Sequence, residues 1–186
     1  RMGHSVEVFE AGDHAGGLLW TGVPEYRLPK ELLEAEIERI VAMGVVIHLN
    51  HKVTDIVAEK EAGKFDAVYL SVGAQMIRKE DVESDDSVYI TDAFSFFNDM
   101  KKDTTPFSKK KVVVYGGGKL AMYLSRMLRR LDSEVAVYFP GDKKLMPAYD
   151  YETEDALAEG VDVQLLKKIT SIKNKQITLE KTSIDK

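Results

Sequence analysis

The sequence predicts an α/β fold with Rossmann-like nucleotide-binding architecture, in which helices flank a parallel sheet in three layers. Strand-like and helix-like segments alternate along most of the 186 residues, which is the pattern of βαβ units. A Gly-rich stretch, Gly116–Ala121, stands between an apolar strand pattern and a helix pattern, as dinucleotide-binding turns do. Hydrophobic residues make up 44% of the chain, so enough apolar surface is available for a packed core.

The first part of the chain places two strand patterns around a strong helix pattern. Val6–Glu10 alternates apolar and charged residues and then meets a Gly-containing turn. A helix is predicted over Pro29–Met43, with the proline at its first position and Gly44 as its C-cap. Strands are predicted over Val45–Leu49 and Phe65–Ser71.

A composition change separates this part from the next. The charged run Arg78–Asp86 is interpreted as a solvated loop, and Thr91–Asp99 as a short helix. Residues 101–110 are polar and basic and contain Pro106, which is typical of a linker.

The second part repeats the strand-turn-helix order and ends in a hairpin. Its predicted elements are strand Lys111–Tyr115, helix Leu120–Leu131, strand Glu134–Phe139, helix Thr153–Glu159, strand Val161–Leu166, and a hairpin of Ile169–Ile172 with Gln176–Leu179.

Charge and composition exclude several classes of protein. The net charge of -5 gives no general basic field for nucleic acid or anionic lipid. No apolar run approaches the roughly 18 residues of a membrane span. The chain has no cysteine, which rules out disulfides and thiolate metal sites in these residues and favours a cytoplasmic setting.

No catalytic side chain and no metal site are predicted. The four histidines lack metal-ligand spacing with carboxylates, and no nucleophile-base pair stands out. Such a pattern fits a cofactor enzyme, in which the cofactor carries the chemistry and the protein orients it.

The Gly116–Ala121 turn carries the strongest chemical signal. Gly116 permits a tight turn, and Gly118 lets the backbone approach a pyrophosphate. Ala121 allows close packing of helix on strand, and the helix N-terminus supplies amide donors. The alternative is a strand-helix turn that binds nothing.

The choice between NADH and NADPH stays open. An acid after the second strand would bind a ribose hydroxyl, and a basic side chain would bind a 2'-phosphate. Asp142 is the candidate acid, and Lys143 and Lys144 are the candidate bases, although each is also an ordinary turn charge.

Further candidates follow the earlier strands. Glu10 ends the first strand, where a ribose-binding acid lies in a Rossmann unit, or it is a plain turn acid. Gly17 and Gly73 could let a ligand approach the backbone or simply permit turns.

Several motifs together resemble the small (beta) subunit family of NADPH-dependent glutamate synthase, whose module also occurs in dihydropyrimidine dehydrogenase. They are Gly3–Ala11, Gly16–Leu19, the string GVPEYRLPKELLEAEIERI over residues 22–40, Phe65–Ala74, Val112–Met122, Leu145–Ala148 and Ala158–Val161. The resemblance extends to about Ile172 and also covers more distant adrenodoxin-reductase-like proteins, which fit the 25–30 string less well.

The resemblance implies two nested nucleotide-binding domains. Residues 1–100 would form a partial FAD-binding domain, residues 101–110 a linker, and residues 111–186 a truncated NAD(P)-binding domain. The first Gly-rich flavin loop is expected upstream of Arg1, so the chain is expected to be an internal piece that is inactive by itself. The cofactor-binding residues that the resemblance implies are Glu10, Gly17, Leu18, Arg27, Val53 and Gly73 for FAD, and Gly116, Gly118, Lys119, Leu120 and Ala121 for NADPH or NADH.

The resemblance also implies electron transfer. Hydride would pass from NAD(P)H to FAD, and electrons would pass to iron-sulfur clusters outside this chain, in a large catalytic subunit or iron-sulfur domain. Lys119 and Tyr123 stand where the family has Asn and Asp, and Pro140 and Gly141 stand where it has paired arginines. These departures leave open a second reading, a non-catalytic docking module with a decayed nucleotide site.

Overall fold

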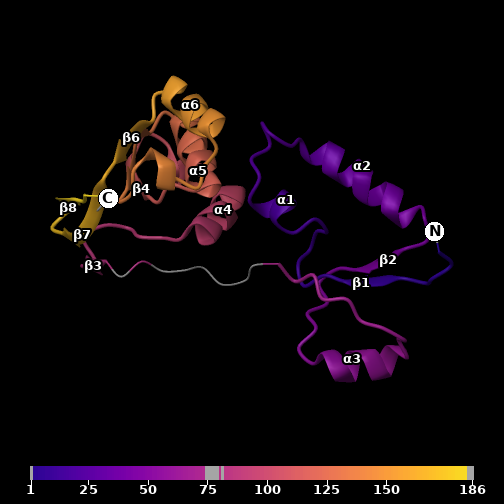
Figure 1. Cartoon of the computed structure of the whole chain (residues 1–186). Helices are drawn as coiled ribbons and strands as arrows, with labels where there is room; N and C mark the ends of the chain where they lie inside the picture. Colours follow the sequence, from indigo (N-terminus) through magenta and orange to yellow (C-terminus); the bar gives the residue numbers. More distant parts are fainter. Residues whose placement is uncertain (1, 74–79, 81, 184–186) are drawn as a thin grey trace. The chain divides into compact units, whose positions relative to one another are not determined.

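The computed structural model describes residues 2–73, 80 and 82–183, which fall into two compact units (Figure 1). The first unit comprises Arg1–Ile77 and the second Arg78–Lys186. The first unit contains β1 (Glu7–Phe9), α1 (Leu18–Thr21), α2 (Lys30–Val41), β2 (Val46–His48) and α3 (Ile56–Gly63). The predicted α/β class is confirmed, because the two units carry parallel strands with flanking helices.

The first unit is built on one parallel strand pair. β1 and β2 pair in register from Glu7 opposite Val46 to Phe9 opposite His48. The α2 helix begins one residue later than predicted, because Pro29 is its N-cap with an extended backbone. It ends at Val41 with Ala42 as C-cap, so the predicted C-cap role of Gly44 is wrong. Gly44 instead takes a positive φ of 95° two residues further on.

The prediction of a strand over Phe65–Ser71 is wrong. Residues 65–71 are all described and none of them belongs to a strand, and Tyr69 is 90% exposed. The apolar pattern is that of a strand, but a strand exists only where a neighbour completes its ladder of hydrogen bonds.

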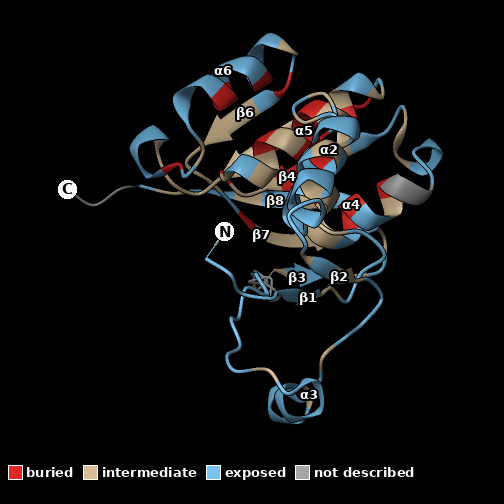
Figure 2. Cartoon of the chain, turned by 90° about the vertical axis from the view of Figure 1, so that its right-hand side faces the viewer, coloured by how far each residue is buried: buried red, intermediate tan, exposed pale blue. Residues whose placement is uncertain are grey.

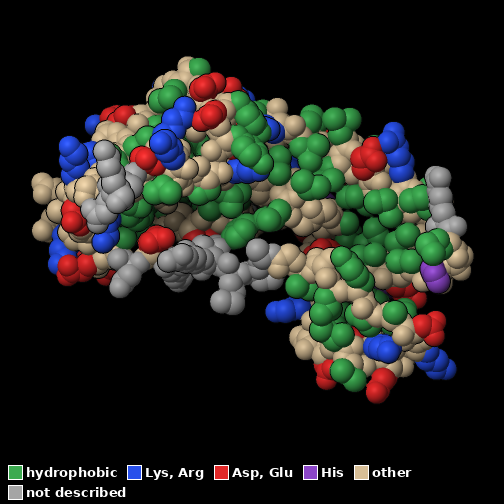
Figure 3. All heavy atoms as spheres, in the orientation of Figure 1, with side chains coloured by type: hydrophobic (Ala, Val, Ile, Leu, Met, Phe, Trp, Pro, Cys, Tyr) green, Lys and Arg blue, Asp and Glu red, His purple; other side chains and the backbone are tan. Residues whose placement is uncertain are grey.

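The α3 helix was not predicted, although its start has a clear signal. Asp55 accepts hydrogen bonds from the amides of Val57 and Ala58 at 3.0 Å each, which is a standard N-cap. Figure 2 shows that the helix is exposed along its length, and it has no buried residue. Hydrophobic side chains of α3, such as Ile56 and Val57, accordingly lie at the surface (Figure 3).

The second unit contains a parallel three-stranded sheet in the order β4-β5-β6. Its elements are β3 (Glu83–Ser84), α4 (Ala93–Lys102), the 3-10 helix η1 (Thr105–Phe107), β4 (Lys111–Tyr115), α5 (Lys119–Arg130), β5 (Glu134–Phe139), η2 (Lys143–Leu145), α6 (Asp150–Ala158), β6 (Asp162–Leu165), β7 (Lys167–Lys173) and β8 (Gln176–Lys181). β4 and β5 have the predicted bounds, whereas α6 begins three residues earlier than predicted.

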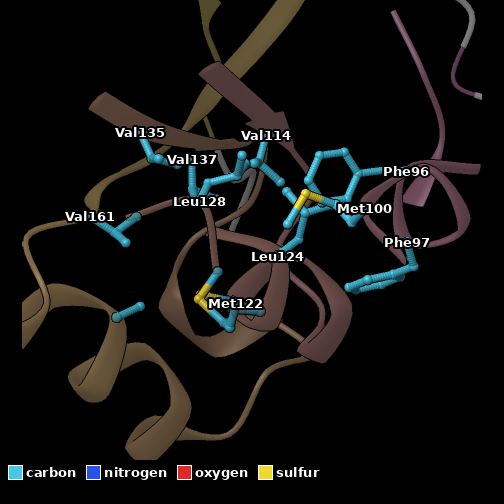
Figure 4. Close-up of a cluster of buried hydrophobic side chains, with 12 residues drawn as sticks. Phe96, Phe97, Met100, Val114, Met122, Leu124, Leu128, Val135, Val137 and Val161 are labelled. Atoms are coloured by element: carbon cyan, nitrogen blue, oxygen red, sulfur yellow. The ribbon is translucent and has the colours of Figure 1, made fainter. Parts of the chain in front are cut away.

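One hydrophobic core holds the second unit together (Figure 4). Met122 and Leu128 on α5 are fully buried against Val137 of the sheet. Phe96 and Phe97 bring α4 into the same cluster. Burial of such side chains contributes roughly 1.5–3 kcal/mol each, so this core fixes α5 and the turn that precedes it.

A second sheet confirms the predicted terminal hairpin and corrects one loop. β7 and β8 are antiparallel neighbours, and β3 pairs with β7 in parallel. Glu83–Ser84 is therefore a strand and not part of a solvated loop, because Ile172 and Ser171 complete its ladder. Arg78, Lys79 and Asp81 of that predicted loop lie outside the described residues.

The segment predicted as a linker is packed against the second unit. The Ser133 hydroxyl donates to the Phe107 carbonyl at 2.6 Å and accepts from the Lys110 amide at 2.9 Å. The Phe107 ring lies 4.8 Å from that of Phe96. The assignment of residues 1–100 to a flavin domain stays a prediction. The boundary between the two compact units lies after residue 77.

A buried ion-pair network joins α5 to α6. The Arg126 guanidinium, with a side chain only 9% exposed, donates to Asp155 at 2.8 Å and to Glu159 at 2.9 and 2.7 Å. Arg130 also donates to Glu159, at 2.8 Å. Hydrogen bonds from Arg130 and then Arg126 lower the pKa of Glu159 to about 2, against the opposing effect of its burial.

The lowered pKa of Glu159 predicts acid sensitivity of the second unit. A carboxyl with a depressed folded-state pKa contributes stability above its unfolded pKa, and this contribution is lost as pH falls from about 4.5 towards 2. Thermal melts at successive pH values measure this. We expect the melting temperature of Glu159→Gln to fall less steeply than that of the wild type between about pH 4.5 and pH 2. The control is Glu154→Gln at an exposed site on the same helix, which should leave the wild-type slope. Identical slopes for Glu159→Gln and wild type would contradict the prediction.

Within the described part of the chain, no helix is both long and apolar enough to cross a membrane.

Candidate functional site

The Gly-rich turn lies between the C-terminal end of β4 and the N-terminus of α5. Gly116 has a φ of 134°, a conformation that favours glycine, and its amide donates to the Tyr138 carbonyl at 3.0 Å. The chain therefore reverses at Gly116 while staying tied to the neighbouring strand β5. This is the tight turn that the sequence predicts at Gly116.

The other two glycines of the turn differ in what surrounds them. A Cβ at Gly117 would lie 2.8 Å from the Phe139 ring and 3.0 Å from Met146. A Cβ at Gly118 would have no atom within 4 Å, so the backbone there is open to a ligand. Sequence reasoning found Gly118 and missed Gly117, because only the fold places the Phe139 ring against it.

The N-terminus of α5 presents backbone amides beside Gly118. Gly118 is the N-cap, and its carbonyl accepts the Met122 amide at 3.2 Å. The amides of Lys119, Leu120 and Ala121 lie in the first turn of the helix, where no preceding helical carbonyl is available to accept their hydrogen bonds. Together with the positive end of the helix dipole, they suit an anionic ligand.

Leu120 and Ala121 follow Lys119 in the first turn of α5. Both side chains are partly buried against the core of the second unit. The Ala121 carbonyl accepts the Ser125 hydroxyl at 2.6 Å. The small Ala121 side chain thus lies at the packed base of the helix, as the sequence predicts.

Lys119 brings a cation to the opening of the turn. Its side chain is exposed, and its ammonium lies 4.0 Å from the centre of the Tyr149 ring. The Ala148 amide donates to the Gly117 carbonyl at 3.0 Å, so the chain before Tyr149 is fastened to the turn. Tyr149 was not among the predicted site residues, because it is far from the turn in sequence.

The candidate charges after β5 are engaged in local structure. Asp142 caps η2 by accepting the Leu145 amide at 3.0 Å. Lys143 pairs with Asp150 at 3.2 Å on the surface. Both contacts are exposed and weak, so they compete little with a charged ligand.

In the first unit, Glu10 lies at the predicted position after β1. Its carboxylate accepts the Gly12 amide at 2.7 Å, and its carbonyl accepts the His51 amide at 2.9 Å. The second bond brings Glu10 close to the segment that contains Val53, which is half-buried. Gly73 has a φ of 70°, and Ala74 of the predicted Gly-Ala turn lies outside the described residues.

Gly17, Leu18 and Arg27 belong to one short folded segment. Gly17 has a φ of 52° and caps α1, which begins at Leu18. Arg27 is exposed, and its amide donates to the Pro24 carbonyl at 2.9 Å. A Cβ at Gly16 would lie 3.1 Å from Leu33, so the preceding glycine packs against α2.

Lys30 holds this segment together and was missed by sequence reasoning. Its ammonium donates to the carbonyls of Leu19, Trp20 and Val23 at 3.2, 2.7 and 3.2 Å. The signal was available, because Lys30 lies within the motif string of residues 22–40. The predicted flavin-binding residues all lie in the first unit, and the Gly-rich turn lies in the second.

Comparison with known proteins supports the resemblance found in the sequence. Residues 3–186 match the family described as pyridine nucleotide-disulphide oxidoreductase. The chain is 38% identical over 175 residues to the NADP(+)-dependent formate dehydrogenase subunit beta of Moorella thermoacetica, covering 91% of this chain and 25% of that protein. It is 30% identical to the glutamate synthase [NADPH] small chain of Escherichia coli, covering 87% of this chain and 37% of that protein.

A solved structure gives the same fold. A 2-naphthoyl-CoA reductase aligns with a TM-score of 0.72 at 17% identity, over 95% of this chain and 26% of that one. The chain thus spans well under half the length of these relatives.

Proposed function

The chain belongs to the pyridine nucleotide-disulphide oxidoreductase family, and from this premise we propose that it is part of a flavoprotein oxidoreductase that takes reducing equivalents from NADPH or NADH. FAD, when bound, accepts hydride from the nicotinamide and passes electrons towards iron-sulfur centres outside this chain. The family uses FAD and NAD(P)H. The role of the described residues is to bind and orient the two cofactors.

One observation carries the proposal: the backbone at Gly118 is open while the backbone at Gly117 is packed. The open space beside Gly118 lets a phosphate group come close to the backbone. The neighbouring amides of Lys119 and Leu120 supply donors for a diphosphate. The Lys119 ammonium adds a positive charge on the same side of the helix start.

For FAD, we propose that Glu10 binds the adenosine ribose and that Gly17, Leu18, Arg27, Val53 and Gly73 lie along the cofactor. The positive φ of Gly17 and the open space at its would-be Cβ support a close backbone approach. The relatives are a subunit beta and a small chain, which supports a partner such as a large catalytic subunit or an iron-sulfur domain. The cysteine-free composition supports a cytoplasmic setting.

A docking module with a decayed nucleotide site is the second candidate. Pro140 and Gly141 offer no charged side chain for the adenosine phosphate. These observations favour weaker nucleotide binding than a paired-arginine clamp would give.

Calorimetric titration of the chain with NADPH and, separately, NADH tests the proposal. We expect binding of at least one nucleotide with a dissociation constant below about 1 mM, since several charge-assisted hydrogen bonds of roughly 1.5–3 kcal/mol each are available. A preference for NADPH would assign Lys143 or Lys144 to the 2'-phosphate. If the folded chain binds neither nucleotide at millimolar concentration, the docking module is the better account.

A further inference from the structure

An aromatic platform stands beside the Gly-rich turn and was assigned no role above. It consists of Tyr149 and Tyr151, whose rings stack with centroids 5.7 Å apart and planes 20° from parallel. The two side chains are 54% and 48% exposed. A stacked and half-exposed aromatic pair next to a nucleotide turn offers a flat apolar surface on which a planar base can stack.

The platform is held rigidly by a buried carboxylate. Glu152 is 1% exposed and accepts the Tyr149 amide at 3.1 Å. It also accepts the hydroxyls of Tyr123 at 3.0 Å and Tyr151 at 3.4 Å. Tyr123 stands on α5, so this carboxylate joins the platform to the helix whose N-terminus faces the nucleotide. A rigid platform loses little entropy when a ligand stacks on it.

The platform lies on the adenosine side of the turn. In a Rossmann unit, the adenosine ribose is recognised at the end of the strand that follows the Gly-rich turn and its helix. Here that strand is β5, and Tyr149 belongs to the segment that leads from β5 to α6. The hydrogen bond from Ala148 to Gly117 holds that segment against the turn.

In the free chain, a cation covers the platform. The Lys119 ammonium lies 4.0 Å from the Tyr149 ring centre, which is a cation-π contact between exposed groups and therefore weak. A diphosphate at the start of α5 would attract the same ammonium more strongly, because charge-assisted hydrogen bonds are stronger than cation-π contacts between exposed groups.

Resting on the function proposed above, we propose that Tyr149 and Lys119 form an adenine subsite that works by exchange. The adenine of the pyridine nucleotide stacks on the Tyr149 ring where the ammonium stood, and the ammonium moves to the diphosphate. The stacked base adds binding that the side chains of Pro140 and Gly141 cannot supply. Base recognition by stacking needs no particular hydrogen-bonding partner.

The test is calorimetric titration of the chain with ADP and with methyl diphosphate, which carries the phosphates without a base. We expect the wild-type chain to bind ADP roughly tenfold more tightly than methyl diphosphate, and Tyr149→Leu to remove that advantage. Tyr149→Phe keeps the ring and should keep the advantage. Lys119→Met should weaken both ligands.

The adenine proton resonances give a readout that a purely structural role would not move. We expect ring-current upfield shifts of H2 and H8 of ADP in the wild type and in Tyr149→Phe, and none in Tyr149→Leu. If Tyr149→Leu fails to unfold cooperatively, the wild-type comparison of ADP with methyl diphosphate decides alone, and equal affinities overturn the subsite.

The outcomes separate the two proposals. Binding of both ligands without an adenine advantage overturns the adenine subsite and leaves the nucleotide turn standing. An adenine advantage without NADPH or NADH binding supports the subsite and counts against the oxidoreductase role. Binding of neither ADP nor methyl diphosphate overturns the subsite together with the proposed function.

Discussion

Gly118→Asp is expected to stabilise the second unit and to abolish nucleotide binding. Gly118 has φ and ψ of -86° and 173°, close to the -86° and 164° of Asp92, which caps α4 through the amides of Phe94 and Ser95. An aspartate at position 118 can therefore cap α5 in the same way. Improved capping and the helix dipole together are worth about 0.5–1 kcal/mol.

The same carboxylate would occupy the amides that we assign to the diphosphate and would repel its charge. Loss of charge-assisted hydrogen bonds predicts at least a roughly 100-fold weaker affinity for NADPH or NADH. Thermal melts and calorimetry on one preparation measure both effects. Gly118→Asn is the matched control, because it caps without a charge and should weaken binding less. Unchanged nucleotide affinity in a folded Gly118→Asp chain would remove the diphosphate from this turn.

The neighbouring glycine should behave in the opposite way. A Cβ at Gly117 would lie 2.8 Å from the Phe139 ring, well inside contact distance. Gly117→Ala is therefore expected to cost about 1–3 kcal/mol of stability through overpacking. Two adjacent glycines of one motif thus serve different purposes, and stability and affinity measured together distinguish them.

Arg126→Met is expected to give the largest loss of stability in the second unit. The substitution keeps much of the aliphatic stem and removes the hydrogen bonds to Asp155 and Glu159. Arg126 is buried, and removal of its charge takes away the ion pair with Asp155 and leaves Glu159 paired with Arg130 alone. We expect a cost of about 2–4 kcal/mol, somewhat below a fully buried pair because Asp155 can reach water. Urea denaturation provides the measurement.

Arg130→Met is the matched control for burial. Arg130 binds the same Glu159 carboxylate, but its side chain is 45% exposed. Exposed ion pairs contribute about 1 kcal/mol or less, so this variant should lose less stability than Arg126→Met. An equal decrease in the free energy of unfolding in the two variants would contradict the prediction, because burial of Arg126 would then add nothing to the strength of its ion pairs.

The sequence by itself determined the local structure of the second unit and the chemical character of its turn. β4 and β5 follow from apolar runs bounded by turn residues, and α5 follows from the helix pattern that the sequence shows over Leu120–Leu131, directly after the Gly-rich turn. The Gly116–Ala121 spacing predicts a nucleotide turn because each position has a local steric reason. Local rules of this kind require no knowledge of distant residues.

Only the tertiary structure decided the features that depend on distant partners. Phe65–Ser71 has the composition of a strand but no ladder partner among the described residues, whereas Glu83–Ser84, in a charged run, pairs with β7. Gly117 differs from Gly118 only because the fold places Phe139 beside it, and Tyr149 reaches Lys119 only because Ala148 binds the turn. Hydrogen-bond ladders and side-chain contacts join residues far apart in the chain, so neither can be read from the local pattern of apolar and polar residues.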